Sequence, residues 1–455
     1  MPFEEVVGRR DVLRLCGGAG LLPIAGCSGT ATDPSFAVPS AALTDEPITV
    51  ELDGLDPRTP VTVRASAASR DGTRWVARAH FETDGDGSLS VPEQAPERGT
   101  YATADPMGLF WSMRPADATP GNRLPPEVLF VPDETAYDVT LSAEANGRTV
   151  AESTTTRRLY DPRIEHRTVG HDAVVGEFFA PPGDAPAPAV VHLHGAGGRP
   201  HVPTGRLLAS RGIATLTLRY FGDPEPIPDT LAEVPVEYVE TAIEWLRGRE
   251  RVRGPNVGLF GFSRGGALAL LAATRSDAIG AVVGWVPSGV VWEGLGYGRV
   301  PAGTSAWSVD GEPVPFLELA DADVGPPPTP SLPFFEPTLS AAGEDELAAA
   351  TIPVEEAETP ILLVSATDDR RWPSTALSER AIDRLEANEY RHEYRHESHA
   401  GAGHYLRFPY LPTAGTERDV RHVYGGGAEA NARAAADAWA ETVAFLADAL
   451  GGAVE

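Results

Sequence analysis

The stretch that most constrains the fold is residues 257–272, which read VGLFGFSRGGALALLA. Its first four residues are mostly apolar and predict a buried strand, while the alanine- and leucine-rich run from Ala267 predicts a helix. Between them stands the G-x-S-x-G sequence of residues 261–265. A sharp turn from strand to helix leaves no room for side chains beside its central residue, so glycines at 261 and 265 fit it. The pattern therefore predicts that Ser263 projects from a tight turn.

A serine in this turn lies at a helix N-terminus, where backbone N–H groups stabilise developing negative charge. We therefore interpret Ser263 as a candidate nucleophile. The alternative is a glycine-rich strand-to-helix turn without chemistry, which five residues cannot exclude. An acid and a histidine further along the chain, in the right order, would favour catalysis.

An acid follows the next strongly apolar run. Residues 361–364 (Ile-Leu-Leu-Val) predict a buried strand, and two aspartates, Asp368 and Asp369, come directly after it. A carboxylate just beyond a strand end is placed to orient a catalytic histidine. We choose Asp369, which stands three residues before Trp372, and expect Asp368 to stabilise the loop.

The histidine candidate is His404, in a predicted loop before the last helix. The order serine, aspartate, histidine is that of α/β-hydrolases. His404 would accept the proton of Ser263 and return it to the leaving group, and Asp369 would fix its tautomer. Three other histidines, His392, His396 and His399, belong to a charged run and are expected to be solvated.

The sequence His194-Gly195-Ala196-Gly197-Gly198 follows a predicted strand at residues 189–193. We expect its Ala196 N–H, together with that of Arg264, to form an oxyanion hole. His192 and His194 also form an H-x-H pair, with which some metal sites begin. Carboxylate or cysteine ligands to complete such a site are not evident, so we predict no metal and no cofactor.

The pattern of strands changes once along the chain. Residues 43–160 hold short alternating runs separated by turn residues, which predict an all-β immunoglobulin-like sandwich. From residue 161 to 455 strands alternate with helices, which predicts a doubly wound, mostly parallel sheet with helices on both faces. An insertion at about 294–347 is rich in proline and glycine; it forms either a cap over the site or a surface loop.

The first 27 residues resemble an export signal. Arg9 and Arg10 look like a twin-arginine motif, and the sequence ending at Cys27 resembles a lipobox, whose cysteine becomes lipidated. Residues 28–42 would then be a linker. We expect an exported protein anchored on the cell surface, with contact to the membrane only through Cys27. If this interpretation is wrong, the protein is cytoplasmic.

The formal net charge is −28, and no lysine occurs. A phosphate backbone attracts the opposite charge, so a nucleic-acid partner is excluded. Such acidity is typical of halophilic proteins, because molar salt shortens the Debye length to about 3 Å and screens self-repulsion. A GC-rich genome accounts for arginine in place of lysine, but not for the net charge.

Several motifs together resemble the acyl-CoA thioester hydrolase and bile acid-CoA:amino acid N-acyltransferase family. They are Asp45-Glu46-Pro47, Gly54-Leu55, residues 105–113 (DPMGLFWSM), residues 207–214 (LLASRGIA), Tyr220-Phe221-Gly222, residues 352–355 (IPVE), Asp368-Asp369 with Trp372-Pro373-Ser374, Gly403-His404-Tyr405 and residues 409–413 (PYLPT). The resemblance covers nearly everything after the signal. It implies a β-sandwich followed by an α/β-hydrolase domain, with Ser263, Asp369 and His404 as the catalytic triad.

The chain departs from this family at two places. The family usually has Ser-Lys-Gly where this chain has Ser263-Arg264-Gly265, and its usual glycine-rich loop is here His194-Gly195. In the family a cysteine at the elbow marks the acyltransferases and a serine the hydrolases. The resemblance therefore implies a serine hydrolase acting on a small-molecule acyl thioester or ester. The alternatives are an exported carboxylesterase, an acyltransferase to an amine, and a non-catalytic surface-binding protein.

Overall fold

The computed structural model describes residues 33–119, 121–170, 174–222, 227–296, 299 and 301–451. The predicted signal segment, with Arg9, Arg10 and Cys27, lies outside these ranges. The chain divides into residues 1–33 and residues 34–455, and the second part forms one compact unit.

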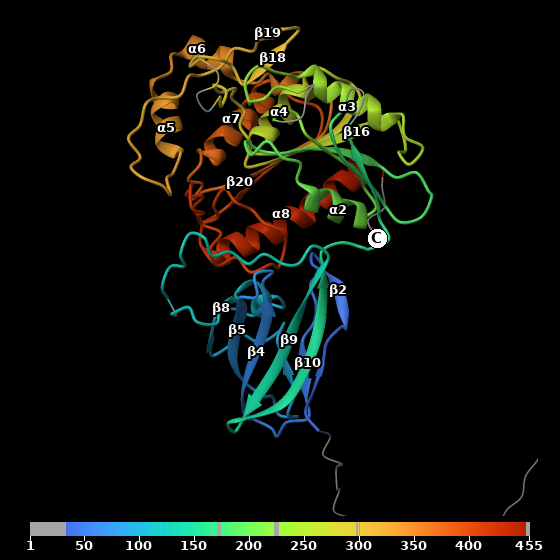
Figure 1. Cartoon of the computed structure of the whole chain (residues 1–455), viewed down its shortest axis with the longest axis vertical. Helices are drawn as coiled ribbons and strands as arrows, with labels where there is room; N and C mark the ends of the chain where they lie inside the picture. The colour runs from blue at the N-terminus through green and yellow to red at the C-terminus, as the bar shows by residue number, and fades with distance from the viewer. Residues whose placement is uncertain are drawn as a thin grey trace, which may run out of the picture. The chain divides into compact units, whose positions relative to one another are not determined.

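The first half of this unit is built from β-strands (Figure 1). Its elements are β1 (Ser35–Ala37), β2 (Ala41–Leu43), β3 (Glu51–Asp53), β4 (Pro60–Ala68), β5 (Arg74–Glu82), β6 (Leu89–Ser90), β7 (Arg98–Gly99), α1 (Gly108–Trp111), β8 (Arg114–Pro115), β9 (Ala136–Ala145) and β10 (Arg148–Arg158). One sheet has the order β1-β3-β6, and the other has β2-β10-β9-β4-β5-β7 with β8 beside β5. One buried cluster holds side chains of both sheets, because apolar residues alternate along the strands.

Two of these strands lie inside the segment expected to be a linker. β1 pairs with β3, and β2 pairs with the far end of β10. Phe36 and Ala42 pack against the buried cluster of the β-region. The prediction of a linker to residue 42 therefore fails for these residues. Strands of three residues are too short to show a reliable alternation of apolar side chains.

The second half contains an eight-stranded sheet in the order β11-β12-β14-β13-β16-β17-β20-β21. Its strands are β11 (Glu165–Val169), β12 (Gly176–Ala180), β13 (Ala189–Leu193), β14 (Ala214–Leu218), β16 (Val257–Phe262), β17 (Ile279–Trp285), β20 (Ile361–Ala366) and β21 (Tyr394–His399). β12 runs antiparallel to both of its neighbours, β11 and β14, and the other neighbouring strands of the sheet are parallel to each other. This strand order and the single reversed strand are those of the α/β-hydrolase fold, as the sequence predicts.

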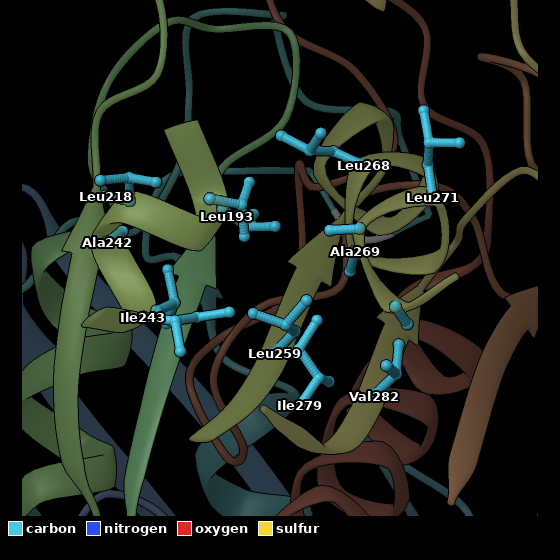
Figure 2. Close-up of a cluster of buried hydrophobic side chains, with 14 of the residues drawn as sticks. Leu193, Leu218, Ala242, Ile243, Leu259, Leu268, Ala269, Leu271, Ile279 and Val282 are labelled. Atoms are coloured by element: carbon cyan, nitrogen blue, oxygen red, sulfur yellow. The ribbon is translucent and has the colours of Figure 1, made fainter. Parts of the chain in front are cut away.

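Helices cover both faces of this sheet. They are α2 (Val202–Ser210), α3 (Glu237–Arg247), α4 (Arg264–Ala273), α7 (Ser374–Ala387) and α8 (Ala428–Ala449). Successive residues of a strand point to opposite faces, so Leu259 packs with α3 and α4 while Phe260 packs with α2 and α8. Figure 2 shows the first of these two clusters, with Leu193, Leu259 and Val282 of the sheet facing side chains of the helices.

The segment between β17 and β20 contains β18 (Trp307–Val309), β19 (Glu312–Pro313), α5 (Leu332–Ala341), α6 (Glu344–Ala350) and a short 3-10 helix (Val354–Glu356). β18 pairs with β15 (Val234–Pro235) in a small separate sheet. Phe335 of α5 packs edge-on against Trp292 and Trp372, with ring centroids 4.8 and 5.7 Å away. This segment is therefore packed against the hydrolase core through aromatic side chains.

The two halves are joined by a buried ion pair. Asp45, whose side chain is 2% exposed, accepts hydrogen bonds of 2.7 and 2.6 Å from Arg211, at the end of α2. The indole of Trp439 in α8 donates a third bond of 2.8 Å to the same carboxylate. Three donors compensate this carboxylate for its lost hydration. Among the helices of the described ranges, none has both the length and the apolar composition to span a bilayer.

Candidate active site

The turn between β16 and α4 has the strained geometry that the sequence predicts. Ser263 has φ 56° and ψ −119°, a left-handed conformation that costs a non-glycine residue about 1–3 kcal/mol. A Cβ on Gly261 would lie 2.1 Å from the Gly265 carbonyl oxygen, and one on Gly265 would lie 2.2 Å from the Leu193 carbonyl oxygen. Both glycines are therefore required because backbone atoms occupy the space of a side chain.

The structure brings the three predicted catalytic residues together. His404 Nε2 lies 3.0 Å from Ser263 Oγ, and its Nδ1 lies 2.8 Å from Asp369 Oδ2. All three side chains are buried. The Nδ1–H of His404 donates a hydrogen bond to the Asp369 carboxylate, which leaves Nε2 as the acceptor for the serine hydroxyl. The arrangement can withdraw the hydroxyl proton as the oxygen attacks a carbonyl carbon.

Asp369 is itself held in place by the backbone that follows it. Its Oδ1 accepts N–H groups from Arg371 at 2.8 Å and Trp372 at 3.3 Å, while Oδ2 faces the histidine. Asp368 points elsewhere: it accepts the Gly426 N–H at 2.9 Å and pairs with Arg370. The two neighbouring aspartates thus have different contacts: Asp369 faces His404, and Asp368 stabilises a loop.

The loop after β13 lies against the nucleophile. A Cβ on Gly195 would be 3.3 Å from the Cβ of Ser263, so the backbone approaches the serine closely at this point. Ala196 is the next residue of that loop, and Arg264 is the first residue of α4. The guanidinium of Arg264 is buried 5.6 Å from the ring centroid of Trp372. The oxyanion roles of the Ala196 and Arg264 N–H groups stay predictions.

The two histidines around this loop are buried. The His194 ring stacks on Tyr220 with centroids 4.1 Å apart, and its Nδ1 lies 2.7 Å from the Gly195 carbonyl oxygen. Burial lowers the pKa of His194 to about 4 and that of His192 well below its usual value. Both are therefore neutral at pH 7. No three His, Cys, Asp or Glu side chains within the described ranges are grouped so that they could hold a metal ion.

One expectation about the remaining histidines is wrong. Residues 394–399 form β21, which pairs with β20, so the charged run is not fully solvated. His396 is half-buried, and its Nε2 lies 2.8 Å from Ser365 Oγ. Burial lowers the pKa of His396. The sequence misled because charged residues on an edge strand hide the strand pattern.

The comparisons with known proteins identify the family. Residues 45–171 match the family described as "Acyl-CoA thioester hydrolase/BAAT N-terminal region", and residues 234–452 match "BAAT / Acyl-CoA thioester hydrolase C terminal". Acyl-coenzyme A thioesterase 1 from Homo sapiens is 30% identical over 422 residues, which cover 90% of this chain and 94% of the relative. The chain belongs to the acyl-CoA thioester hydrolase/BAAT family.

Another relative is the peroxisomal succinyl-coenzyme A thioesterase of Mus musculus, 29% identical over 415 residues, with 90% of this chain and 94% of that protein covered. Solved structures are more distant. A puromycin-hydrolyzing peptidase from Mycobacterium tuberculosis has a TM-score of 0.40 at 15% identity, covering 85% of this chain and 54% of that one. A dienelactone hydrolase from Anabaena variabilis has a TM-score of 0.33 at 18% identity, covering 56% and 93%.

Proposed function

We propose that this protein is a serine hydrolase that cleaves acyl thioesters of the acyl-CoA type, or esters, through an acyl-Ser263 intermediate. The observation that carries the proposal is the hydrogen-bonded chain from Ser263 through His404 to Asp369. The family supports the thioester bond as the target, since its relatives include proteins named acyl-coenzyme A thioesterases.

The geometry suits a two-step acyl transfer. In the first step Ser263 Oγ attacks the carbonyl carbon while its proton moves to His404 Nε2. The oxyanion of the tetrahedral intermediate accepts hydrogen bonds from the backbone N–H groups of Ala196 and Arg264. Collapse breaks the carbon–sulfur or carbon–oxygen bond, and the leaving group takes the proton from His404. In the second step water attacks the acyl carbon while His404 Nε2 takes its proton; the bond between that carbon and Ser263 Oγ then breaks, Oγ takes the proton back from His404, and the acid leaves.

Water is the proposed acceptor because the nucleophile is a serine. An acyltransferase to an amine would need an amine to compete with water at the same acyl-enzyme. A binding protein without catalysis would not need a strained serine in hydrogen-bond contact with a histidine. Small-molecule acyl compounds are therefore the proposed substrates.

The proposal is tested first with a fluorophosphonate probe, which reacts with activated serines whatever the natural substrate. The wild type is expected to be labelled and Ser263→Ala not. Ser340→Ala, a change at an exposed serine of α5, is the matched control and should label normally. Labelling that survives in Ser263→Ala would place the reactive serine elsewhere. A panel of acyl-CoA and acyl-ester substrates of increasing chain length then identifies the leaving group.

Location decides between two substrate classes. We propose that the protein is exported and anchored through Cys27, because a twin-arginine pair, an apolar stretch and a lipobox-like sequence follow in order. An exported enzyme would act on external esters, since acyl-CoA is a cytoplasmic metabolite. Cys27→Ser should release the protein from the membrane fraction. Intact wild-type chain in the cytosol would overturn export and favour acyl-CoA.

We also propose that the β-region is an immunoglobulin-like sandwich. Two sheets share one buried cluster, and long antiparallel strands β4, β5, β9 and β10 alternate buried and exposed residues. An experimental structure that packed these sheets edge to edge would contradict this assignment.

A further inference from the structure

The segment that carries His404 is held by contacts far from it in sequence. The His404 N–H donates to the Tyr424 carbonyl oxygen at 2.9 Å, and the Asp368 N–H donates to the Ala402 carbonyl oxygen at 2.9 Å. The Gly403 N–H has a side-chain acceptor instead, Asn431 Oδ1 at 2.8 Å. The residue directly before the catalytic histidine is thus fixed by an asparagine of α8.

Asn431 is fixed in its turn. It is 1% exposed, and its Nδ2 donates to Thr416 Oγ1 at 2.9 Å while Oδ1 accepts from Gly403. A Cβ on Gly426 would lie 2.1 Å from Asn431 Oδ1, so the backbone closes around the amide. Because a backbone N–H needs an acceptor and the threonine hydroxyl can accept, the two contacts define which way the amide points.

The hydrogen-bond path continues into the β-region. Thr416 Oγ1 donates to the Thr413 carbonyl oxygen at 2.7 Å, and the Thr413 N–H donates to the Trp111 carbonyl oxygen at 3.1 Å. Trp111 ends α1, and its indole donates to Asp105 at 2.8 Å. Both threonines are buried. An unbroken chain of hydrogen bonds therefore leads from Asp105 to the residue beside His404.

We propose that Asn431 is a positioning residue for His404, and that through Thr416 and Thr413 it couples the histidine loop to the β-region. This rests on the proposed function, since it takes His404 as the general base. His404 must remain within hydrogen-bond reach of Ser263, and a displacement of about 1 Å can lower a rate on the order of 100-fold. Buried, fully satisfied polar networks hold such geometry more rigidly than separate bonds.

The test compares three variants with a control. Asn431→Leu removes both bonds while keeping a branched side chain of the same length, Asn431→Asp keeps an acceptor for the Gly403 N–H, and Thr416→Val removes the link towards the β-region. Asn388→Leu is the control, because Asn388 bonds only to its own helix end at an exposed site. The measurements are the rate constant of fluorophosphonate labelling, kcat and KM on the best substrate, and Tm.

Asn431→Leu is expected to lower kcat and the labelling rate in parallel, on the order of 10- to 100-fold, with KM within about twofold of the wild type. Asn431→Asp and Thr416→Val should show smaller losses of the same kind, and Asn388→Leu none. A folded Asn431→Leu that labels at the wild-type rate, or loses activity only through KM, overturns the proposal. If Asn431→Leu does not fold, wild-type labelling rates in both Asn431→Asp and Thr416→Val overturn it. Absence of labelling in the wild type would instead refute the proposed function, and the inference with it.

Discussion

The nucleophile turn and the histidine loop solve the same problem in different ways. Each holds a reactive side chain next to glycines whose hydrogen atoms face backbone oxygens, at Gly261 and Gly403 respectively. The turn around Ser263 is closed by its own strand and helix and by neighbouring β13. The loop of His404 is closed by residues 20 or more positions away, among them Gly425 and Asn431, and by the β-region beyond. One half of the site is thus specified by its own strand and helix with neighbouring strands, and the other by segments from several parts of the fold.

The largest expected effect is the loss of hydrolysis when either Ser263 or His404 is replaced, because the two regions act as one unit. Ser263→Ala and His404→Ala should each remove nearly all hydrolysis, about 10⁴-fold or more, while Tm changes little. The double variant should be hardly worse than either single one, because the two residues act in the same step. Steady-state kinetics of the three variants decide it. Losses that multiplied in the double variant would mean that the regions act independently.

The second prediction concerns the two aspartates. Asp369→Asn should lower kcat about 10⁴-fold, because an amide in contact with Nδ1 disturbs the tautomer that leaves Nε2 free to accept. Asp368→Asn should cost about tenfold or less, since its amide oxygen still accepts the Gly426 N–H. The kcat values of the two variants at pH 8 measure the difference. The reverse ranking would make Asp368 the acid.

The third prediction separates local from distributed support. Gly261→Ala places a Cβ 2.1 Å from a backbone oxygen inside the strand-to-helix unit, so several kcal/mol of stability should be lost. Gly403→Ala meets the Gly425 oxygen at the same distance, in a loop, and should lower kcat more than Tm. Thermal melts and kinetics compare the two variants. Gly85→Ala, at a glycine with open space around it, is the control.

Low pH is expected to reduce the folding stability that buried His194, beside the turn of Ser263, contributes. The pKa of His194 is about 4 in the folded protein, below its usual value near 6.5, so the unfolded chain binds more protons between these two pH values. Stability is therefore expected to fall as the pH drops from 6.5 towards 4, by about 3 kcal/mol from His194. Urea melts across this window should show a smaller loss in His194→Phe. The same replacement at exposed His392 serves as the control; an unchanged slope in His194→Phe would rule out this assignment.

Added salt is expected to raise the thermal stability of the whole protein without distinguishing the two regions. The net charge of −28 is unscreened at low ionic strength, where the Debye length is about 30 Å at 0.01 M, and screened in molar salt. Tm should rise by roughly 5 °C or more between these conditions, a shift that corresponds to a few kcal/mol. The relative activities of the loop variants should stay constant. Circular dichroism melts in a salt series measure the effect, and a flat Tm would remove the halophile hypothesis.

The difference between the two regions also explains what the sequence could predict. Ser263 is readable because its glycines stand two residues away on either side and are needed for backbone closure. The sequence placed Asp369 beside a strand end, but only the folded backbone shows that its carboxylate, unlike that of Asp368, faces His404. Nothing marks Asn431, since its partners lie 15 and 28 positions away.

The same limit applies to the fold. The alternation of strands and helices predicted a mostly parallel sheet with helices on both faces. The order of serine, aspartate and histidine and the family resemblance pointed to an α/β-hydrolase domain, and the order of the sheet agrees with it. Helix α8, the last helix, begins at Ala428, eleven residues before its first large apolar side chain, Trp439. Its first turns are rich in alanine, which favours helix but provides no large apolar side chain whose spacing could be recognised. Segments of small residues and very short strands are the hardest to predict from sequence, because their side chains show little apolar periodicity.

The hydrogen-bond path from Trp111 to Gly403 affects the order in which parts of the candidate site form while the chain is synthesised. A ribosome makes the β-region first, and N-terminal domains generally fold first as the chain emerges. Ser263 follows, and its turn is closed by its own strand and helix, by β13 made before it and by β17 made directly after α4. Asn431 emerges after the whole β-region, and Thr413, to which it is linked through Thr416, docks on Trp111, which was made some 300 residues earlier. Under the role proposed for Asn431, His404 is held beside Ser263 only after Asn431 has emerged, so the candidate site is completed later than the turn of Ser263.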